Sequence, residues 1–236
     1  MKKHYNLLIL LLLVILIIGG CALKDKLLNK EITQKEVNSN LLLNLEFNNI
    51  SDSSDYGNEV IAYGGSIIDE FYSFDGKSYL KINKDFNNKE ISIGFWIKPT
   101  KRQNGFILAN GPVTNTPSLS IYFDTFKRIK FNRGRESKYT EAGTIPFNNW
   151  TFVFITNDGI TKFYVNGVKI SEIDQEFEQN SNHTETYIGK GFECSSIYGS
   201  FRCSDSFFYG DLDDVRIYNE VLNEEKIKLI YEEIKK

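Results

Sequence analysis

Cysteine, histidine and tryptophan are scarce in this chain of 236 residues, which has 3 Cys, 2 His and 2 Trp. Beyond the N-terminal stretch only Cys194, Cys203 and His183 remain of the first two kinds. A structural zinc site takes four ligands, mostly Cys and His, and Ser–His or Cys–His catalysis needs a histidine beside its nucleophile. The supply and spacing of these residues argue against both kinds of site.

Positive charge is not in excess, because 28 Lys and Arg stand against 31 Asp and Glu. A protein that binds nucleic acid normally carries a basic patch or stripe, and none is visible in the sequence. An internal repeat is also missing. We therefore expect neither a nucleic-acid partner nor a repeat architecture.

Long apolar runs are rare, and the strongest, Leu7 to Ile18, is short for a membrane helix, which needs roughly 20 apolar residues. It follows Lys2 and Lys3 and ends in Gly19 and Gly20. A positive start, a short apolar run and small residues are typical of a secretory signal peptide.

The end of this run, Ile18-Gly19-Gly20-Cys21, resembles the bacterial lipobox, in which the cysteine is lipidated and becomes the mature N-terminus. The resemblance implies a lipoprotein signal peptide over 1–20, a lipidated Cys21 and a polar tether over 21–40. It places the protein in a bacterial cell envelope, at the surface or the outer membrane. An ordinary signal peptide with a chance cysteine is the alternative.

Residues 149–170 form the clearest structural pattern in the rest of the chain. The turn sequences Asn157-Asp158-Gly159 and Asn166-Gly167 separate runs of aromatic and β-branched residues. Such turns between such runs are typical of β-hairpins. The segment therefore predicts a three-stranded meander with one face, including Phe163 and Val165, turned to a core.

Short runs of the same kind continue on both sides, separated by turn residues, and predict an all-β fold. Asp75-Gly76 predicts a hairpin between two of these runs, Gly191–Ser206 an aromatic-rich loop, and Asn223–Lys236 a C-terminal helix. On the last strand, Asp213 alternates in step with Val215 and Ile217, which predicts a carboxylate on the core face. Residues 41–236 thus form one antiparallel two-sheet sandwich or jelly roll with a short C-terminal helix. The predicted strands are 41–47, 60–63, 71–74, 79–82, 91–99, 106–109, 119–123, 128–131, the meander, 186–189 and 207–218.

Several spaced motifs together resemble the laminin-G-like, concanavalin A-like jelly-roll family. This resemblance implies two antiparallel sheets packed face to face, with Trp96 and Trp150 in or beside the core. It leaves function open, because such folds include sugar-binding modules, protein-binding modules and hydrolases. The motifs are Phe74-Asp75-Gly76, Ile91 to Pro99, Trp150-x-Phe152-Val153, Asp158-Gly159, Phe163 to Gly167, Tyr187-Ile188-Gly189 and Gly210 to Tyr218.

The resemblance also implies a structural calcium ion between the loop after the first strand and the last strand. Asp55 and Asn58 match the first region and Asp213 the second, and calcium prefers oxygen ligands of this kind. The alternative is that Asp55 stabilises an Asx turn and Asp213 accepts hydrogen bonds from loop amides.

Ligands in this family meet loops or a sheet face, and the predicted loop offers Phe192, Tyr198, Phe201 and Arg202. Aromatic rings suit the apolar faces of sugars, and arginine suits carboxylates or sulfates. A disulfide between Cys194 and Cys203 would close the loop in an exported protein; two free thiols are the alternative. The aromatic residues could instead pack a small cluster under the loop.

Residues 172–176, Glu-Ile-Asp-Gln-Glu, resemble the carboxylate-bearing strand of related glucanases, but Gln175 stands where that strand buries an aliphatic residue. The carboxylates are therefore interpreted as a solvated edge, and we expect no enzymatic activity. The sequence predicts a surface-anchored module that binds a glycan or glycoprotein. A polysaccharide hydrolase using Glu172 and Glu176, and a structural envelope protein, remain as alternatives.

Overall fold

The computed structural model describes residues 39–111, 118–134, 136–175, 183–197 and 200–234. The chain divides between Asn40 and Leu41, and the fold below is that of residues 41–236. The predicted signal peptide and the predicted lipidation site, Cys21, lie outside the described residues. Among the residues described, no helix has the length and apolar character needed to cross a membrane.

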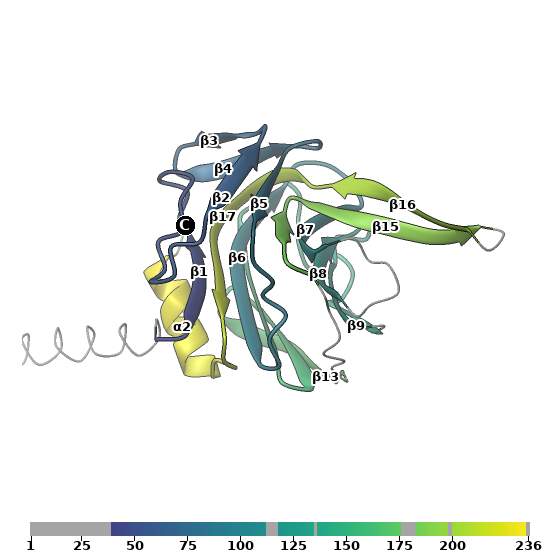
Figure 1. Cartoon of the computed structure of the whole chain (residues 1–236). Helices are drawn as coiled ribbons and strands as arrows, with labels where there is room; N and C mark the ends of the chain where they lie inside the picture. Colours follow the sequence, from purple (N-terminus) through teal and green to yellow (C-terminus); the bar gives the residue numbers. More distant parts are fainter. Residues whose placement is uncertain (1–38, 112–117, 135, 176–182, 198–199, 235–236) are drawn as a thin grey trace, which may run out of the picture. The chain divides into compact units, whose positions relative to one another are not determined.

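Two large antiparallel sheets form the domain, and each takes strands from distant parts of the chain (Figure 1). The eight-stranded sheet has the order β13-β12-β11-β6-β17-β4-β3, with β1 added to β17. Its strands are β1 (Leu41–Leu45), β3 (Ser66–Ile68), β4 (Phe71–Asp75), β6 (Ile91–Pro99), β11 (Thr151–Asn157), β12 (Ile160–Val165), β13 (Val168–Asp174) and β17 (Tyr209–Tyr218).

The seven-stranded sheet has the order β10-β9-β8-β7-β14-β5-β2. This arrangement confirms the predicted two-sheet, all-β fold. Its strands are β2 (Val60–Tyr63), β5 (Tyr79–Ile82), β7 (Gly105–Asn110), β8 (Ser118–Phe123), β9 (Ile129–Gly134), β10 (Glu136–Tyr139) and β14 (Thr186–Ile188).

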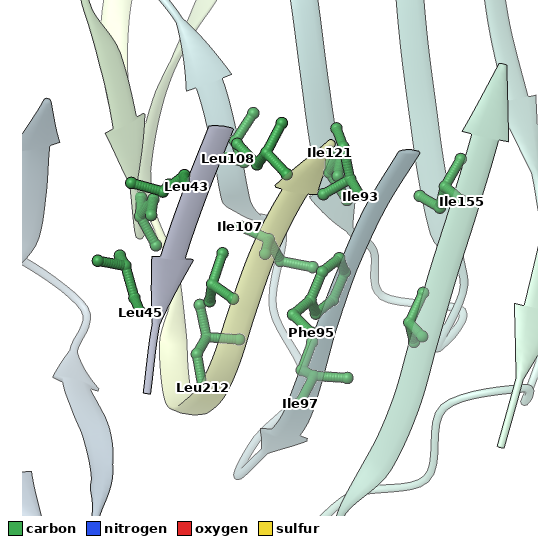
Figure 2. Close-up of a cluster of buried hydrophobic side chains, with 14 of the residues drawn as sticks. Leu43, Leu45, Ile93, Phe95, Ile97, Ile107, Leu108, Ile121, Ile155 and Leu212 are labelled. Atoms are coloured by element: carbon green, nitrogen blue, oxygen red, sulfur yellow. The ribbon is translucent and has the colours of Figure 1, made fainter. Parts of the chain in front are cut away.

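The core lies between the sheets, where alternate side chains of both point inward (Figure 2). Ile93, Phe95 and Ile97 enter it from β6, and Ile107 and Ile121 enter it from the other sheet. All five are at most 1% exposed. Because side chains alternate across a strand, this core fixes which residues of each strand face outward.

The predicted meander is confirmed as β11, β12 and β13, in which β12 pairs with both neighbours. Asn166 and Gly167 have φ values of 50° and 77°, the left-handed conformation that a two-residue hairpin turn requires. Phe163 lies in the core. Tyr164 stands opposite Phe154 and is also buried, on the other face of the sheet. The register shift between β12 and β13 adds a residue on β13 and leaves this alternation intact.

The predicted hairpin at Asp75-Gly76 is wrong. Gly76 does form a turn, with φ 84°, but β4 pairs with β17 and β3, whereas β5 pairs with β14 and β2. The turn thus carries the chain from one sheet to the other. The dipeptide predicts a tight reversal, but the choice of partner strand depends on β17, which lies far along the chain.

Asp213 does not share the core face with Val215 and Ile217. Asp213 pairs with Trp96, Asp214 has φ 47°, and the register shifts before Arg216. This bulge adds a residue, so Leu212, Val215 and Ile217 face the core while Asp213 faces the outer side. Strict alternation therefore fails at this point of the strand.

Residues 191–206 do not form the predicted loop. They belong to a hairpin of β15 (Lys190–Ile197) and β16 (Ser200–Phe207), which pair with each other as a separate two-stranded sheet. In Figure 1 this hairpin extends well away from the two large sheets. Only its base belongs to their surface, where β15 approaches β7 and the side chain of Phe106 lies against Gly191.

The C-terminal helix α2 (Glu224–Glu233) is confirmed, with Asn223 as its N-cap. Tyr231 of this helix packs on Trp96 and Phe152, at ring-centroid distances of 5.9 and 5.7 Å. Trp96 and Phe152 are opposed across β6 and β11, on the face of the eight-stranded sheet that points away from the core. Trp96 is therefore buried beside the core, under the helix.

Candidate ligand-binding face

The outer face of the seven-stranded sheet carries the candidate site, and strand alternation puts its residues there. On β5, Leu80 and Ile82 are buried in the core, so Tyr79 and Lys81 face outward. On β14, Ile188 is in the core and Tyr187 faces outward for the same reason. Because β5 and β14 pair directly, these outward side chains are neighbours.

Five partly exposed aromatic side chains gather here, and we call them the aromatic face. Tyr63 of β2 stacks on Tyr79 with ring centroids 4.5 Å apart and planes 10° apart. Tyr79 lies 5.9 Å from Tyr187 and 6.3 Å from Phe207. Phe192, at the base of the hairpin, meets Tyr187 edge-on at 5.6 Å. The face is thus built from three strands of the sheet and both strands of the hairpin.

Lys190 lies among these rings. Its ammonium nitrogen is 4.8 Å from the centroid of Tyr79, 5.0 Å from that of Phe192 and 5.6 Å from that of Phe207. It also forms an ion pair with Asp205, with Nζ 2.9 Å from Oδ2. A cation within about 6 Å of a ring centroid is attracted by the electrons of the ring. Lys190 is therefore held by both the rings and the carboxylate.

A second ion pair borders the aromatic face, where Lys81 Nζ lies 2.6 Å from Glu185 Oε1. The Tyr187 hydroxyl donates to the same carboxylate. These hydrogen bonds from Lys81 and Tyr187 hold the pKa of Glu185 below its usual range. Burial and the bond to Glu185 raise the pKa of Tyr187. The hydroxyl therefore stays protonated at neutral pH, and the Tyr187 ring is fixed in orientation.

Only part of the predicted ligand-binding set can be placed. Phe192 belongs to the aromatic face, whereas Tyr198 lies outside the described residues. Phe201 and Arg202 lie on β16, but their side chains are not among those described. Four members, Tyr63, Tyr79, Tyr187 and Phe207, were not predicted, although the alternation of Tyr79 with Leu80 already indicated one of them.

Cys194 and Cys203 are directly opposed in the register of the hairpin. Opposed residues of an antiparallel pair have Cα atoms about 4.5–5.5 Å apart, a separation that a disulfide can bridge. The backbone is thus suited to the predicted disulfide, which stays a prediction.

The three predicted calcium ligands have different surroundings. The described part of the chain contains no group of three or more His, Cys, Asp or Glu suited to a metal. Asp55 is exposed. The Asn58 side chain donates through Nδ2 to Leu42 O and to Asp52. Asp213 is buried and accepts a hydrogen bond from the Asp214 amide. Calcium binding stays a sequence prediction.

Asp52, which was not singled out from the sequence, organises the loop after β1. Its carboxylate accepts five hydrogen bonds of 2.6–2.9 Å from Asn44, Ser54 and Asn58, three of them from backbone amides. Burial raises the pKa of Asp52, but these hydrogen bonds outweigh it and leave the pKa below its usual value. The N–H and O–H donors thus stabilise the charged form of this carboxylate.

The glucanase-like carboxylates lie at the edge of the eight-stranded sheet, on β13. Glu172 and Asp174 are exposed, and Glu176 lies outside the described residues. A hydrogen bond from Lys169 at 3.1 Å holds the pKa of Glu172 below its usual range. A general acid needs the opposite shift. Gln175 is buried and bonds to Thr161 and the Glu136 carbonyl.

Similar folds occur in receptor-binding domains of botulinum neurotoxins. A type C structure, titled for the dependence of cell entry on two ganglioside molecules, matches with a TM-score of 0.65 and 19% identity over 86% of this chain and 53% of that chain. A type DC binding domain in complex with rat synaptotagmin II matches with a TM-score of 0.63 and 18% identity, over 84% and 52%. This chain therefore spans about half the length of those domains, and at such identity the likeness shows the fold alone.

A search of the curated proteins gave no match. A family model does match, over residues 74–228, and is described as the concanavalin A-like lectin/glucanases superfamily. The matched range begins at the end of β4 and reaches helix α2, and it includes most of both sheets and of the aromatic face. The chain belongs to the concanavalin A-like lectin/glucanases superfamily.

Proposed function

We propose that this domain is a non-enzymatic module that binds a glycan, free or on a glycoprotein, through the aromatic face. The observation that carries the proposal is the group of five partly exposed rings around Lys190 on the outer side of the seven-stranded sheet. Tyr63 is the most open of these residues, with 43% of its surface exposed.

The geometry suits a sugar for two reasons. The apolar C–H face of a pyranose can stack on an aromatic ring, and the stacked pair Tyr63–Tyr79 offers such a ring near solvent. Two ion pairs beside the rings supply donors and acceptors for hydroxyl groups, so polar groups surround an apolar centre, as in small-molecule sites generally. Packing of the rings holds them in place before a ligand arrives, which lowers the ordering cost of binding.

The likeness to neurotoxin receptor-binding domains supports a binding role, since those proteins interact with gangliosides and with synaptotagmin. For this chain both a glycan and a protein partner follow only as proposals, because the fold hosts many functions.

The proposal places the module at a bacterial cell surface, tethered through lipidated Cys21. Its support is the lipobox-like sequence Ile18-Gly19-Gly20-Cys21. Metabolic labelling with a fatty-acid analogue should mark the wild-type chain and leave Cys21→Ser unmarked. Equal labelling of both would rule out this anchor.

A glycan array probed with the purified chain, with calcium and with a chelator, tests the binding function. For a glycan that binds, Tyr79→Ala and Tyr187→Ala should each weaken binding about tenfold, since stacking on one ring contributes about 1 kcal/mol or more. Tyr56→Ala is the matched control, because Tyr56 is 57% exposed and lies outside the aromatic face. Failure to bind any glycan would refute the proposal.

A further inference from the structure

We propose that the ligand of the aromatic face is an acidic sugar whose carboxylate takes the place of Asp205 at Lys190. This inference rests on the proposed function and adds the chemical class of the ligand, a uronic or sialic acid residue within a glycan. It follows from how unequally the two members of the Lys190–Asp205 ion pair are held.

Lys190 is firmly held. Its side chain is only 12% exposed, and its ammonium group lies within 4.8–5.7 Å of the centroids of Tyr79, Tyr187, Phe192 and Phe207. Its backbone forms the first pair of the hairpin, opposite Phe207. A cation that is so largely removed from water needs an anion nearby, and Lys190 will keep one whichever group supplies it.

Asp205 is loosely held by comparison. Its side chain is 45% exposed, and its ion pair of 2.9 Å with Lys190 joins the two strands of the hairpin, where Asp205 itself stands opposite Phe192. The carboxylate is thus already largely hydrated while it is paired, so turning it into solvent costs little desolvation energy. Asp205 can therefore turn into solvent at small cost when another carboxylate reaches Lys190, and the exchange leaves the number of buried charges unchanged.

The neighbouring ion pair, Lys81–Glu185, differs because its carboxylate has a second partner. Glu185 is paired with Lys81 at 2.6 Å and also accepts a hydrogen bond from Tyr187. Displacing it would break both interactions, so Lys81 is not available to a ligand. Of the two lysines at the aromatic face, Lys190 is the one that can exchange its partner.

The position of Lys190 also suits a sugar ring that carries a carboxylate substituent. Its ammonium group is 4.8 Å from the Tyr79 centroid, and Tyr79 stacks on the exposed Tyr63. Tyr79 is thus shared by the stacked pair and by Lys190, so an acidic sugar that contacts Tyr79 has Lys190 as the nearest cation for its carboxylate. Tyr79 would stack on the sugar and Lys190 beside it would bind the carboxylate. This arrangement favours a carboxylated sugar over a neutral one.

The test compares acidic oligosaccharides with their own methyl esters, which differ only in charge at the carboxyl group. Oligogalacturonate, a hyaluronan oligosaccharide and sialyllactose, each with its methyl ester, are titrated into the full chain by calorimetry. We expect one acid to bind about tenfold more tightly than its ester, with a preference that falls as salt is added.

Two variants assign the preference to the ion pair. Asp205→Asn removes the competing carboxylate and should tighten binding of the acid about threefold, with the ester unchanged. Lys190→Met keeps an apolar side chain of similar length and should abolish the preference of acid over ester. Glu136→Gln is the control, since Glu136 pairs with Lys138 at 3.0 Å on the same sheet but outside the aromatic face; it should change neither affinity.

The outcomes separate the two proposals. Equal binding of acid and ester, unaffected by Asp205→Asn, would overturn the acidic-sugar inference and leave the glycan-binding function standing. Weaker acid binding by Asp205→Asn would also overturn it, because Asp205 would then assist the ligand. Absence of binding to every acid, ester and neutral glycan would overturn the proposed function itself.

Discussion

Removal of the Asp52 carboxylate, a single side-chain group, should destabilise the fold. Without that carboxylate, the amides of Asn44, Ser54 and Asn58 lose their acceptor in a largely buried place. An unsatisfied buried donor costs about 1–3 kcal/mol, so Asp52→Ala should lower the free energy of unfolding by about 3 kcal/mol. Urea denaturation of the wild type and the variant measures this change in the free energy of unfolding. Asp55→Asn, at an exposed position of the same loop, should change stability by less than about 0.5 kcal/mol.

The same residue should make stability depend on pH in a defined direction. Hydrogen bonds leave the pKa of Asp52 lower in the folded chain than in the unfolded chain, where it is about 3.9. The stabilisation is therefore complete above the unfolded pKa and is lost as pH falls through the folded one. The difference in unfolding free energy between wild type and Asp52→Asn should shrink below about pH 4. A difference that stays constant from pH 6 to pH 2 would contradict this.

Among the elements, the β15–β16 hairpin is a two-stranded sheet of its own and pairs with neither large sheet. An isolated two-stranded hairpin is marginally stable in water, and a disulfide between the opposed Cys194 and Cys203 would add roughly 3 kcal/mol in the chain-entropy model. Without reductant, neither thiol should react with an alkylating reagent. Cys194→Ser/Cys203→Ser should make the hairpin sensitive to protease while the rest of the domain resists. Alkylation of both cysteines in the untreated chain would exclude the disulfide.

Helix α2 depends on its N-cap, where the Asn223 side chain accepts a hydrogen bond of 2.9 Å from the Lys226 amide. Asn223→Ala should cost about 1 kcal/mol, measured as a lower midpoint of thermal unfolding. Because Tyr231 covers Trp96, fraying of the helix should also change tryptophan fluorescence. Asn223→Asp keeps the acceptor and should restore wild-type stability.

For the whole domain, a buried polar network joins the sheets near one end. Arg133 of β9 is 0% exposed and donates to Asn157 Oδ1 of β11 at 2.5 Å. Asn157 Nδ2 in turn donates to Thr161 Oγ1 at 2.8 Å. Burial lowers the pKa of Arg133 to about 10, so the guanidinium group is still charged at neutral pH. A buried charge stabilises a fold only together with its partners.

Asn157→Ala should therefore destabilise the whole domain by about 3 kcal/mol, visible in one cooperative urea transition. Asn132→Ala is the control, since Asn132 bonds to Ser120 on the outer side of the seven-stranded sheet, and it should cost about 1 kcal/mol. Equal effects of the two variants would show that the link between the sheets adds no stability.

The fold was largely predictable, because patterns such as Asn166-Gly167 and the alternation along 91–99 are local. The errors at Asp75-Gly76 and Asp213 have one physical cause, since partner strands and bulges are decided by contacts between residues distant in the chain. The aromatic face was missed for the same reason. Phe192 was predicted from an aromatic-rich segment, but Tyr63, Tyr79 and Tyr187 meet it only after β2, β5 and β14 pair.

The hairpin leaves the sandwich at the pair formed by Lys190 and Phe207, and it extends far from that point (Figure 1). The hairpin is thus a long arm that is attached to the domain at one end, at the aromatic face. A rotation of a few degrees at this pair is magnified toward the tip in proportion to the length of the arm. A ligand bound at Lys190 therefore lies at the position from which the direction of the hairpin is set.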